Sequence, residues 1–230
     1  KSFDRHVRGQ AGQKSVEVDA LGHEKRTVQV DKPLAGNDLY LTIDIRLQKV
    51  AEELLGEESG AIVALDPTSG DVLAMASRPG FDPNIMSREL TPKQWVEIVQ
   101  DERRPLNNRA SQGQYPPGST FKLVSALAST RFGVRSPTEW FVDEGSVKIG
   151  DREFRNDNGI RHGSVDLARA LAVSSDTYFY TVGDAFWRRW NRDDTTSGLG
   201  LQQEAQALGF GAPTGIEIDE SSGRVPDPDW

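Results

Sequence analysis

Two residues that could form a nucleophilic pair, Ser119 and Lys122, stand three positions apart behind the segment Tyr115-Pro116-Pro117-Gly118. Side chains at this spacing lie on one face of a helix, so a helix that begins near Ser119 would let the lysine ammonium reach the serine hydroxyl. A free serine is a poor nucleophile at neutral pH, but a partly desolvated lysine beside it can act as its base. The proline-rich segment, which ends in glycine, suits a sharp turn into such a helix. The pair therefore predicts an activated serine.

A second polar cluster, Ser174-Ser175-Asp176, comes at the predicted start of another helix. A hydroxyl at this place could relay a proton, and the carboxylate could hold a lysine or a substrate amide. Taken alone, the cluster is more typical of a helix cap, and a lone Ser-x-x-Lys is more typical of a cap followed by a solvated lysine. The two motifs together favour one shared catalytic site.

The helix that carries the serine is expected over residues 119–131 and is apolar on nearly all sides. This pattern predicts a buried helix. An unpaired buried ammonium is costly, so Lys122 at the start of this helix needs polar partners. The apolar residues are Leu123, Val124, Ala126, Leu127 and Ala128.

An apolar hairpin is expected earlier in the chain. Residues 61–65 and 72–76 are apolar runs joined by a turn that contains Pro67 and Gly70, which is typical of paired strands. Because the runs are nearly continuous instead of alternating, we expect both faces of the hairpin to be covered, in the middle of a layered α/β or α+β core.

Periodicity and turn residues predict the remaining elements. In chain order these are a polar hairpin or linker within residues 1–38, a short strand at 40–43, a helix capped by Asp44 and ended by Gly56, a short helix after Thr91-Pro92, a strand at 146–149, a helix from Gly163 or Ser164 to Leu171, a helix from 174 towards Trp190, a mobile loop at 193–198 and a small helix at 201–208.

Composition indicates a soluble globular protein and excludes several classes. Of the 230 residues, 36% are hydrophobic and 27% charged, which is ordinary for a folded domain. The net charge of -8 argues against nucleic acid as a partner. The sequence contains no cysteine, which excludes disulfides, thiolate metal sites and cysteine nucleophiles. No apolar run approaches the roughly 20 residues that span a bilayer, and the start at Lys1 favours an internal piece of a longer, secreted or anchored protein.

The order Ser119, Lys122, Ser174, Asp176 resembles the Ser-x-x-Lys and Ser-x-Asn/Asp motifs of penicillin-binding proteins and serine β-lactamases. The segment from Gly60 to Ser77 is similar to the opening hairpin of a class B penicillin-binding protein transpeptidase domain. Further matches are Phe81-Asp82-Pro83-Asn84, Asn107 to Ala110, Tyr115 to Gly118, Gly163 to Leu167, Ala170-Leu171 and Gly215-Ile216-Glu217. The resemblance covers nearly the whole chain, and within it the elongation transpeptidases, the PBP2 type, look closest.

The resemblance implies an α+β fold of the penicillin-binding and serine β-lactamase type, with helices packed on a mainly antiparallel sheet. Residues 1–38 would be the β-rich end of an N-terminal pedestal or linker, and residues 39–230 the N-terminal part of the transpeptidase domain. The reaction implied is D-Ala-D-Ala cross-linking of peptidoglycan stem peptides. Ser119 would form the acyl-enzyme, Lys122 would take its proton, Ser174 would pass a proton to the leaving amine, and Asp176 would hold the lysine and the substrate amide.

The resemblance also implies partners and a location. The partners would be stem peptides on a lipid-linked precursor polymer, β-lactam antibiotics that acylate Ser119, and a membrane glycosyltransferase of the elongation complex. The location would be the extracytoplasmic face of the bacterial cytoplasmic membrane, with the anchor outside this chain. The resemblance implies no cofactor and no metal.

One departure from the family pattern concerns its third motif, Lys-Ser/Thr-Gly. This tripeptide does not occur in the sequence, and Lys148-Ile149-Gly150 precedes the second motif and lacks the hydroxyl. In the family that strand supplies a cation and an amide of the oxyanion hole, whose loss typically costs about 10²-fold or more in rate. We therefore expect this piece to be incomplete at its C-terminal end and inactive by itself.

Other functions remain as alternatives. A class D-like β-lactamase or β-lactam sensor domain shares Ser-Thr-Phe-Lys, although Asp176 argues against it, and the chain could also be a non-catalytic interaction module whose residues 1–38 dock on a partner. The three histidines lie far apart, which disfavours a Ser-His-Asp triad. His162 could join Asp143 and Asp157 at a metal, but such residues in a polar loop are usually solvated.

Overall fold

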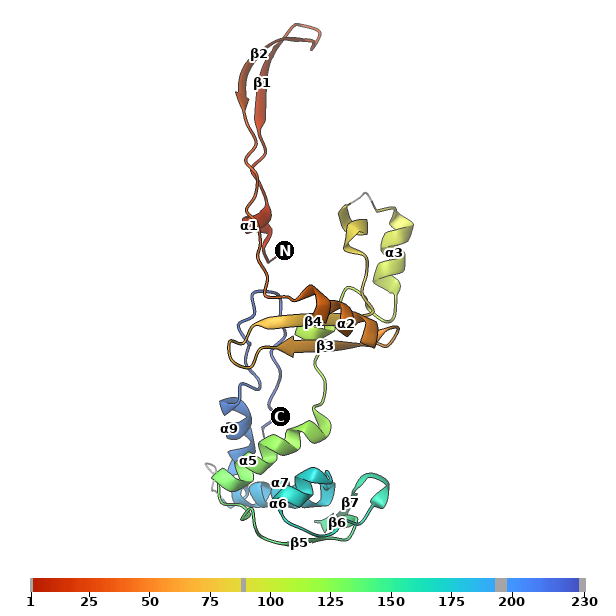
Figure 1. Ribbon diagram of the computed structural model, residues 1–230, viewed down its shortest axis with the longest axis vertical. Coiled ribbons are helices and arrows are strands. Elements are labelled where there is room, and N and C mark those ends of the chain that lie inside the picture. Colours follow the sequence, from red (N-terminus) through yellow and green to blue (C-terminus); the bar gives the residue numbers. More distant parts are fainter. Residues whose placement is uncertain (1, 88–89, 193–197, 228–230) are drawn as a thin grey trace. The chain divides into compact units, whose positions relative to one another are not determined.

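The computed structural model describes residues 2–87, 90–192 and 198–227 (Figure 1). The chain divides into two compact units. The N-terminal unit comprises Lys1–Gly113 and Ile216–Asp219, and the C-terminal unit comprises Gln114–Gly215 and Glu220–Trp230. The predicted catalytic residues all belong to the C-terminal unit.

The first part of the N-terminal unit is a solvent-exposed hairpin. A short helix, α1 (Asp4–Val7), precedes the antiparallel strands β1 (Gln13–Val18) and β2 (Glu24–Asp31). Every residue of both strands is exposed. Cross-strand ion pairs join them, including Lys14 to Glu24 and Arg26 to Glu17, each at 2.6 Å. The hairpin expected within residues 1–38 is confirmed.

Helix α2 (Ile45–Leu55) covers one face of the hairpin formed by β3 (Gly60–Leu65) and β4 (Val72–Arg78) (Figure 1). Asp44 caps α2 by accepting from the Arg46 N–H, as predicted, and the hydrogen bond from the Arg46 side chain holds the pKa of Asp44 well below its usual range. Gly56 ends the helix with a φ of 50°. The core here consists of small residues, Ala51, Ala74 and Ala76.

Two expectations for this region are wrong. The hairpin is covered on one face only, since the burial of β3 alternates and Val63 and Leu65 are 43% and 56% exposed in the part of the chain that is described. Residues 40–43 form no strand. They meet β4 only near its start, where the Thr42 hydroxyl donates to the Val72 carbonyl, so no ladder of backbone hydrogen bonds develops.

Among the described residues, three short helices lie in the rest of the N-terminal unit, together with irregular segments. Thr91 and Gln94 form a capping box at the start of the predicted short helix. The elements are the 3₁₀ helix η1 (Pro83–Ser87), α3 (Pro92–Gln100) and α4 (Arg109–Gln112).

The C-terminal unit packs its helices around one apolar core, built from α5, α6 and α7 and extended by α9. Tyr178, Val182 and Phe186 on α7 are among its largest fully buried side chains. The elements are η2 (Gly118–Phe121), α5 (Lys122–Arg131), β5 (Phe141–Asp143), β6 (Ser146–Ile149), β7 (Arg152–Arg155), η3 (Asp157–Gly159), β8 (Gly163–Val165), α6 (Leu167–Ala172), α7 (Asp176–Trp190) and α9 (Gly200–Ala207).

Several boundaries in this unit differ from the predicted ones. Residues 163–165 are a strand paired with β5, so the following helix is capped by Asp166 and not by Gly163 or Ser164. Helix α5 is buried on one side only, since Leu123 and Leu127 are 61% and 50% exposed. The loop expected at 193–198 lies, except for its last residue, outside the described residues. No helix in the described ranges is both long and apolar enough to span a membrane.

Candidate active site

Ser119 lies in a tight helical turn that leads directly into α5. Gly118 enters the turn with a φ of 57°, a left-handed conformation that favours glycine. The turn is η2, and α5 begins at Lys122, whose N–H donates to the carbonyls of Ser119 and Thr120. Ser119 is exposed, whereas Lys122 is buried. The nucleophile candidate therefore faces solvent while its partner lies behind it.

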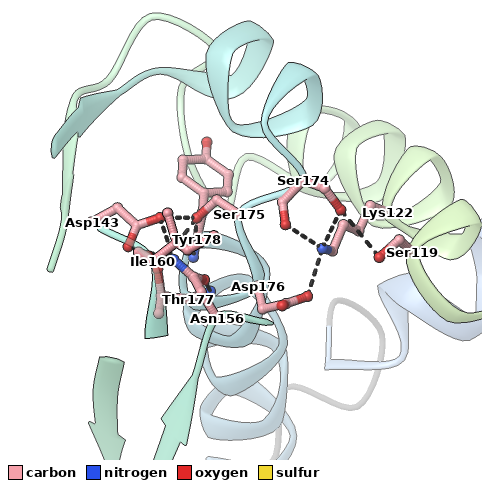
Figure 2. Close-up of polar contacts among 10 residues, drawn as sticks. All are labelled: Ser119, Lys122, Asp143, Asn156, Ile160, Ser174, Ser175, Asp176, Thr177 and Tyr178. Atoms are coloured by element: carbon pink, nitrogen blue, oxygen red, sulfur yellow. Dashed lines mark hydrogen bonds and ion pairs between the residues drawn. The ribbon is translucent and has the colours of Figure 1, made fainter. Parts of the chain in front are cut away.

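The second motif spans the last two residues of the three-residue connection between α6 and α7 and the first residue of α7. The N–H of Ser174 donates to the Leu171 carbonyl and the N–H of Ser175 to the Ala170 carbonyl, the pair of bonds that defines a Schellman motif. Ser174 occupies the left-handed position of this motif, with a φ of 55°, where glycine is usual. This sharp turn brings both the carbonyl and the hydroxyl of Ser174 towards Lys122 (Figure 2).

All three donors of the Lys122 ammonium are satisfied by the second motif. Nζ donates to the Ser174 carbonyl at 2.7 Å, to Ser174 Oγ at 2.8 Å and to Asp176 Oδ1 at 2.6 Å (Figure 2). The lysine side chain is 11% exposed and that of Asp176 27%, and the Phe179 ring centroid lies 6.0 Å from Nζ. The partners that a buried lysine requires are therefore Ser174 and Asp176.

Ser119 is linked to Lys122 through Ser174. The Ser174 hydroxyl donates to Ser119 Oγ at 3.1 Å while it accepts from Lys122 Nζ. The direct hydrogen bond expected from the Ser-x-x-Lys spacing is not among those of the described residues, because Ser119 precedes α5 in a 3₁₀ turn and the ammonium is directed to the α6–α7 connection. The result is a continuous chain of three polar groups from an exposed hydroxyl to a buried amine.

A buried polar cluster lies behind the second motif, and the sequence did not reveal its arrangement. Asp143 at the end of β5 is fully buried and accepts from the Ser175 hydroxyl at 2.6 Å and from Asn156 Nδ2 at 2.8 Å. The alternative metal site of Asp143, Asp157 and His162 is not formed, since the described residues contain no group of three potential ligands placed to hold an ion. The sequence places Asp143 in a polar loop. In the structure it is the last residue of β5, and the pairing of β5 with β8 buries it.

Ser174 holds an unfavourable backbone conformation, which leads to a prediction about stability. We expect Ser174→Gly to be more stable than Ser174→Ala by about 1 kcal/mol, because both remove the hydroxyl but only alanine retains the cost of the left-handed conformation. Denaturant unfolding of the two variants measures the difference. A glycine variant no more stable than the alanine variant would contradict the strain assigned to Ser174.

The geometry shows what the site can do chemically: an exposed serine connected through a second serine to a buried lysine, with an aspartate that fixes the lysine, suits a serine nucleophile served by a lysine base. The comparisons with known proteins give the family. Residues 60–230 match the family described as penicillin binding protein transpeptidase domain, and residues 1–41 match the penicillin-binding protein dimerisation domain. The chain belongs to the penicillin-binding protein transpeptidase family.

Individual relatives agree with this assignment. The chain is 36% identical over 236 residues to the peptidoglycan D,D-transpeptidase MrdA of Acinetobacter baumannii, covering 100% of this chain and 33% of the relative. PBP2 from Helicobacter pylori, solved in complex with MreC, has a TM-score of 0.83 and 30% identity, covering 100% of this chain and 42% of that one. Penicillin-binding protein A of Mycobacterium tuberculosis, solved as an imipenem acyl-enzyme, has a TM-score of 0.69 and 27% identity, covering 85% and 46%.

These matches confirm the resemblance to PBP2-type penicillin-binding proteins and the predicted α+β transpeptidase fold. The chain spans about a third of the length of the curated relatives it matches.

Proposed function

We propose that the protein carrying this chain is a peptidoglycan D,D-transpeptidase of the PBP2 type, with Ser119 as nucleophile. The observation that carries the proposal is the hydrogen-bonded chain from Ser119 through Ser174 to Lys122, closed by Asp176. The relatives named as D,D-transpeptidases support it. The family assignment favours this activity over a class D-like β-lactamase or sensor.

The geometry supports a division of roles in the proposed reaction. Ser119 Oγ attacks the carbonyl of the penultimate D-alanine, and its proton passes to the neutral amine form of Lys122, directly or through the Ser174 hydroxyl. The peptide C–N bond then breaks, and the proton returns through Ser174 to the leaving amine, so that free D-alanine departs and an ester remains on Ser119. The amine of a second stem peptide attacks this ester and regenerates the serine. Asp176 holds Lys122 throughout.

The partners and location follow from the same proposal. The substrate would be stem peptides on a lipid-linked precursor polymer, and β-lactams would acylate the same serine, as imipenem does in the tuberculosis relative. The Helicobacter PBP2 forms a complex with MreC. By analogy, we propose that the protein carrying this chain assembles with a membrane glycosyltransferase of the elongation machinery, at the extracytoplasmic face of the membrane. The exposed hairpin β1–β2 leaves the surface of its strands free for such contacts.

Labelling with a fluorescent penicillin and intact-mass analysis tests the proposal, using the full-length protein. We expect one stable adduct with the mass of the intact drug, located by peptide mapping on the peptide that contains Ser119. The physical reason is that a β-lactam opens on the activated serine and leaves an ester that is released slowly.

Two other outcomes would contradict the proposal. Rapid turnover of the drug would favour a β-lactamase, and the absence of an adduct would favour a non-catalytic interaction module. A full-length variant with Ser125→Ala, further along α5, is the matched control and should label normally, because within the described part of the chain the Ser125 hydroxyl bonds only to the Phe121 carbonyl.

A further inference from the structure

A carboxylate is buried directly behind the residues that contact Lys122. Asp143 is fully buried, and its oxygens accept from the Ser175 hydroxyl at 2.6 Å and from Asn156 Nδ2 at 2.8 Å (Figure 2). They also accept from the Gly145 N–H at 2.8 Å. All of these donors are neutral. A buried charge held without a cation is costly unless its hydrogen bonds are well made, so this arrangement calls for an explanation.

The cluster around Asp143 organises the first turn of α7. An ionised carboxylate only accepts hydrogen bonds, so the Ser175 hydroxyl and the Asn156 amide group must both donate to it. Their oxygens are then turned to α7, where Ser175 Oγ accepts from the Tyr178 N–H at 3.2 Å and Asn156 Oδ1 from the Thr177 N–H at 2.9 Å. Two free N–H groups at the start of α7 are thus capped by side chains that Asp143 orients.

The cap residue Ser175 lies between the two residues that contact the lysine. Ser174 and Asp176 face Lys122, while Ser175 points in the opposite direction, to Asp143 (Figure 2). Holding Ser175 therefore fixes where its two neighbours lie. Asn156 adds a second anchor, since Nδ2 also donates to the Ile160 carbonyl at 2.7 Å and so ties α7 to the loop before β8.

The backbone next to Asp143 requires glycine at position 145, whose N–H donates to the carboxylate. Gly145 has a φ of 84°, and a Cβ at this position would meet the Gly159 carbonyl oxygen at 2.4 Å. Burial opposes ionisation of Asp143, but the hydrogen bonds from Ser175, Asn156 and Gly145 outweigh it and keep the pKa of the carboxyl below its usual value. At neutral pH the group is therefore ionised and remains a pure acceptor.

We propose that Asp143 is a positioning residue of the active site, which acts through Ser175 and Asn156 to hold Ser174 and Asp176 in contact with Lys122. This inference rests on the proposed function, since it assigns Asp143 to the acylation of Ser119. Asp143 itself does not touch the reacting atoms.

The variant Asp143→Asn in the full-length protein tests this role. Its side-chain NH₂ group would face the donors of Ser175, Asn156 or Gly145, so the hydrogen bonds that orient the α7 start cannot all be kept. Stopped-flow labelling with a fluorescent penicillin separates the dissociation constant of the initial complex from the first-order acylation constant. We expect the acylation constant to fall by roughly tenfold to a hundredfold, as for a small misplacement of catalytic groups, with the dissociation constant unchanged.

The same experiment separates positioning from stability alone. If Asp143 only stabilised the fold, the variant would contain fewer active molecules, but those that label would react with the wild-type acylation constant, and that result would overturn the proposal. The matched control is Asp151→Asn, which changes an exposed carboxylate in the β6–β7 turn and should react as the wild type does.

A second variant keeps the test decisive if Asp143→Asn does not fold. Ser175→Ala removes the shortest hydrogen bond to Asp143, and it should lower the acylation constant in the same way. In the double variant Asp143→Asn with Ser175→Ala, the two decreases in the acylation constant should not add, because both substitutions break the same hydrogen-bonded connection. An unchanged acylation constant in Ser175→Ala counts against the proposal. If the wild type itself is not acylated, the proposed function fails and the role of Asp143 in it fails too, whereas a labelled wild type with unaffected variants refutes the positioning role alone.

Discussion

Ser119→Ala is expected to abolish covalent labelling by penicillin completely while leaving the protein folded. The hydroxyl is exposed and its only hydrogen bond among the described residues is the one it accepts from Ser174, so its removal costs little stability. Among the residues that the structure describes, no other hydroxyl at the site combines exposure with a link to Lys122 and a position at the end of the chain of polar groups. Intact-mass analysis after incubation with the drug measures the result.

The Ser119→Ala variant should still form the initial drug complex. Retained non-covalent binding, measured by competition at equilibrium, would show that the loss concerns chemistry and not folding. An adduct of undiminished yield on this variant would mean that another residue is the nucleophile, and peptide mapping would then identify it. Ser174 is the first residue to examine in that event, since its hydroxyl is also exposed.

Lys122→Met should have the second largest effect. Methionine keeps most of the volume of the lysine stem but removes the ammonium, so Ser119 loses the group proposed to take its proton. We expect the acylation constant to fall by about 10³-fold, within the range typical of a lost general base. The measurement is the rate of penicillin labelling in stopped flow or, if slow, by manual sampling.

This substitution also leaves Asp176 without its ion-pair partner, so some stability should be lost. A double variant, Lys122→Met with Asp176→Asn, removes the unpaired charge and should recover stability but not acylation. The control Lys148→Met removes an exposed lysine of β6 and should leave labelling unaffected. Acylation of Lys122→Met at the wild-type rate would exclude Lys122 as the base.

The sequence was sufficient to predict that Ser119, Lys122, Ser174 and Asp176 come together, because the residues of each motif are close in the chain. The spacing of Ser119 and Lys122 and the cap-like run from Ser174 to Asp176 each predicted a helix start, and the structure brings all four side chains together. The hairpins of residues 13–31 and 60–78 were also predictable, since turn residues separate runs of strand-forming residues. The family resemblance added the order of the motifs.

Features that depend on tertiary contacts could not be predicted in the same way. Apolar content alone does not say which faces are covered, so Val63, Leu123 and Leu127 were expected to be buried but are exposed. The strand at Gly163–Val165 forms because Phe141–Asp143 pairs with it, and no local pattern reveals this partner. The role of Asp143 depends on the same pairing, which buries a residue that a polar loop would leave in water.

The connection between α6 and α7 also has a consequence for changes in chain length. Along residues 174, 175 and 176 the side chains alternate, the outer two facing Lys122 and the middle one facing Asp143. Insertion or deletion of one residue would exchange the two sets, placing a structural side chain at the lysine and a reactive one in the buried cluster. The number of residues between these helices is therefore as strict a requirement of the site as their identity.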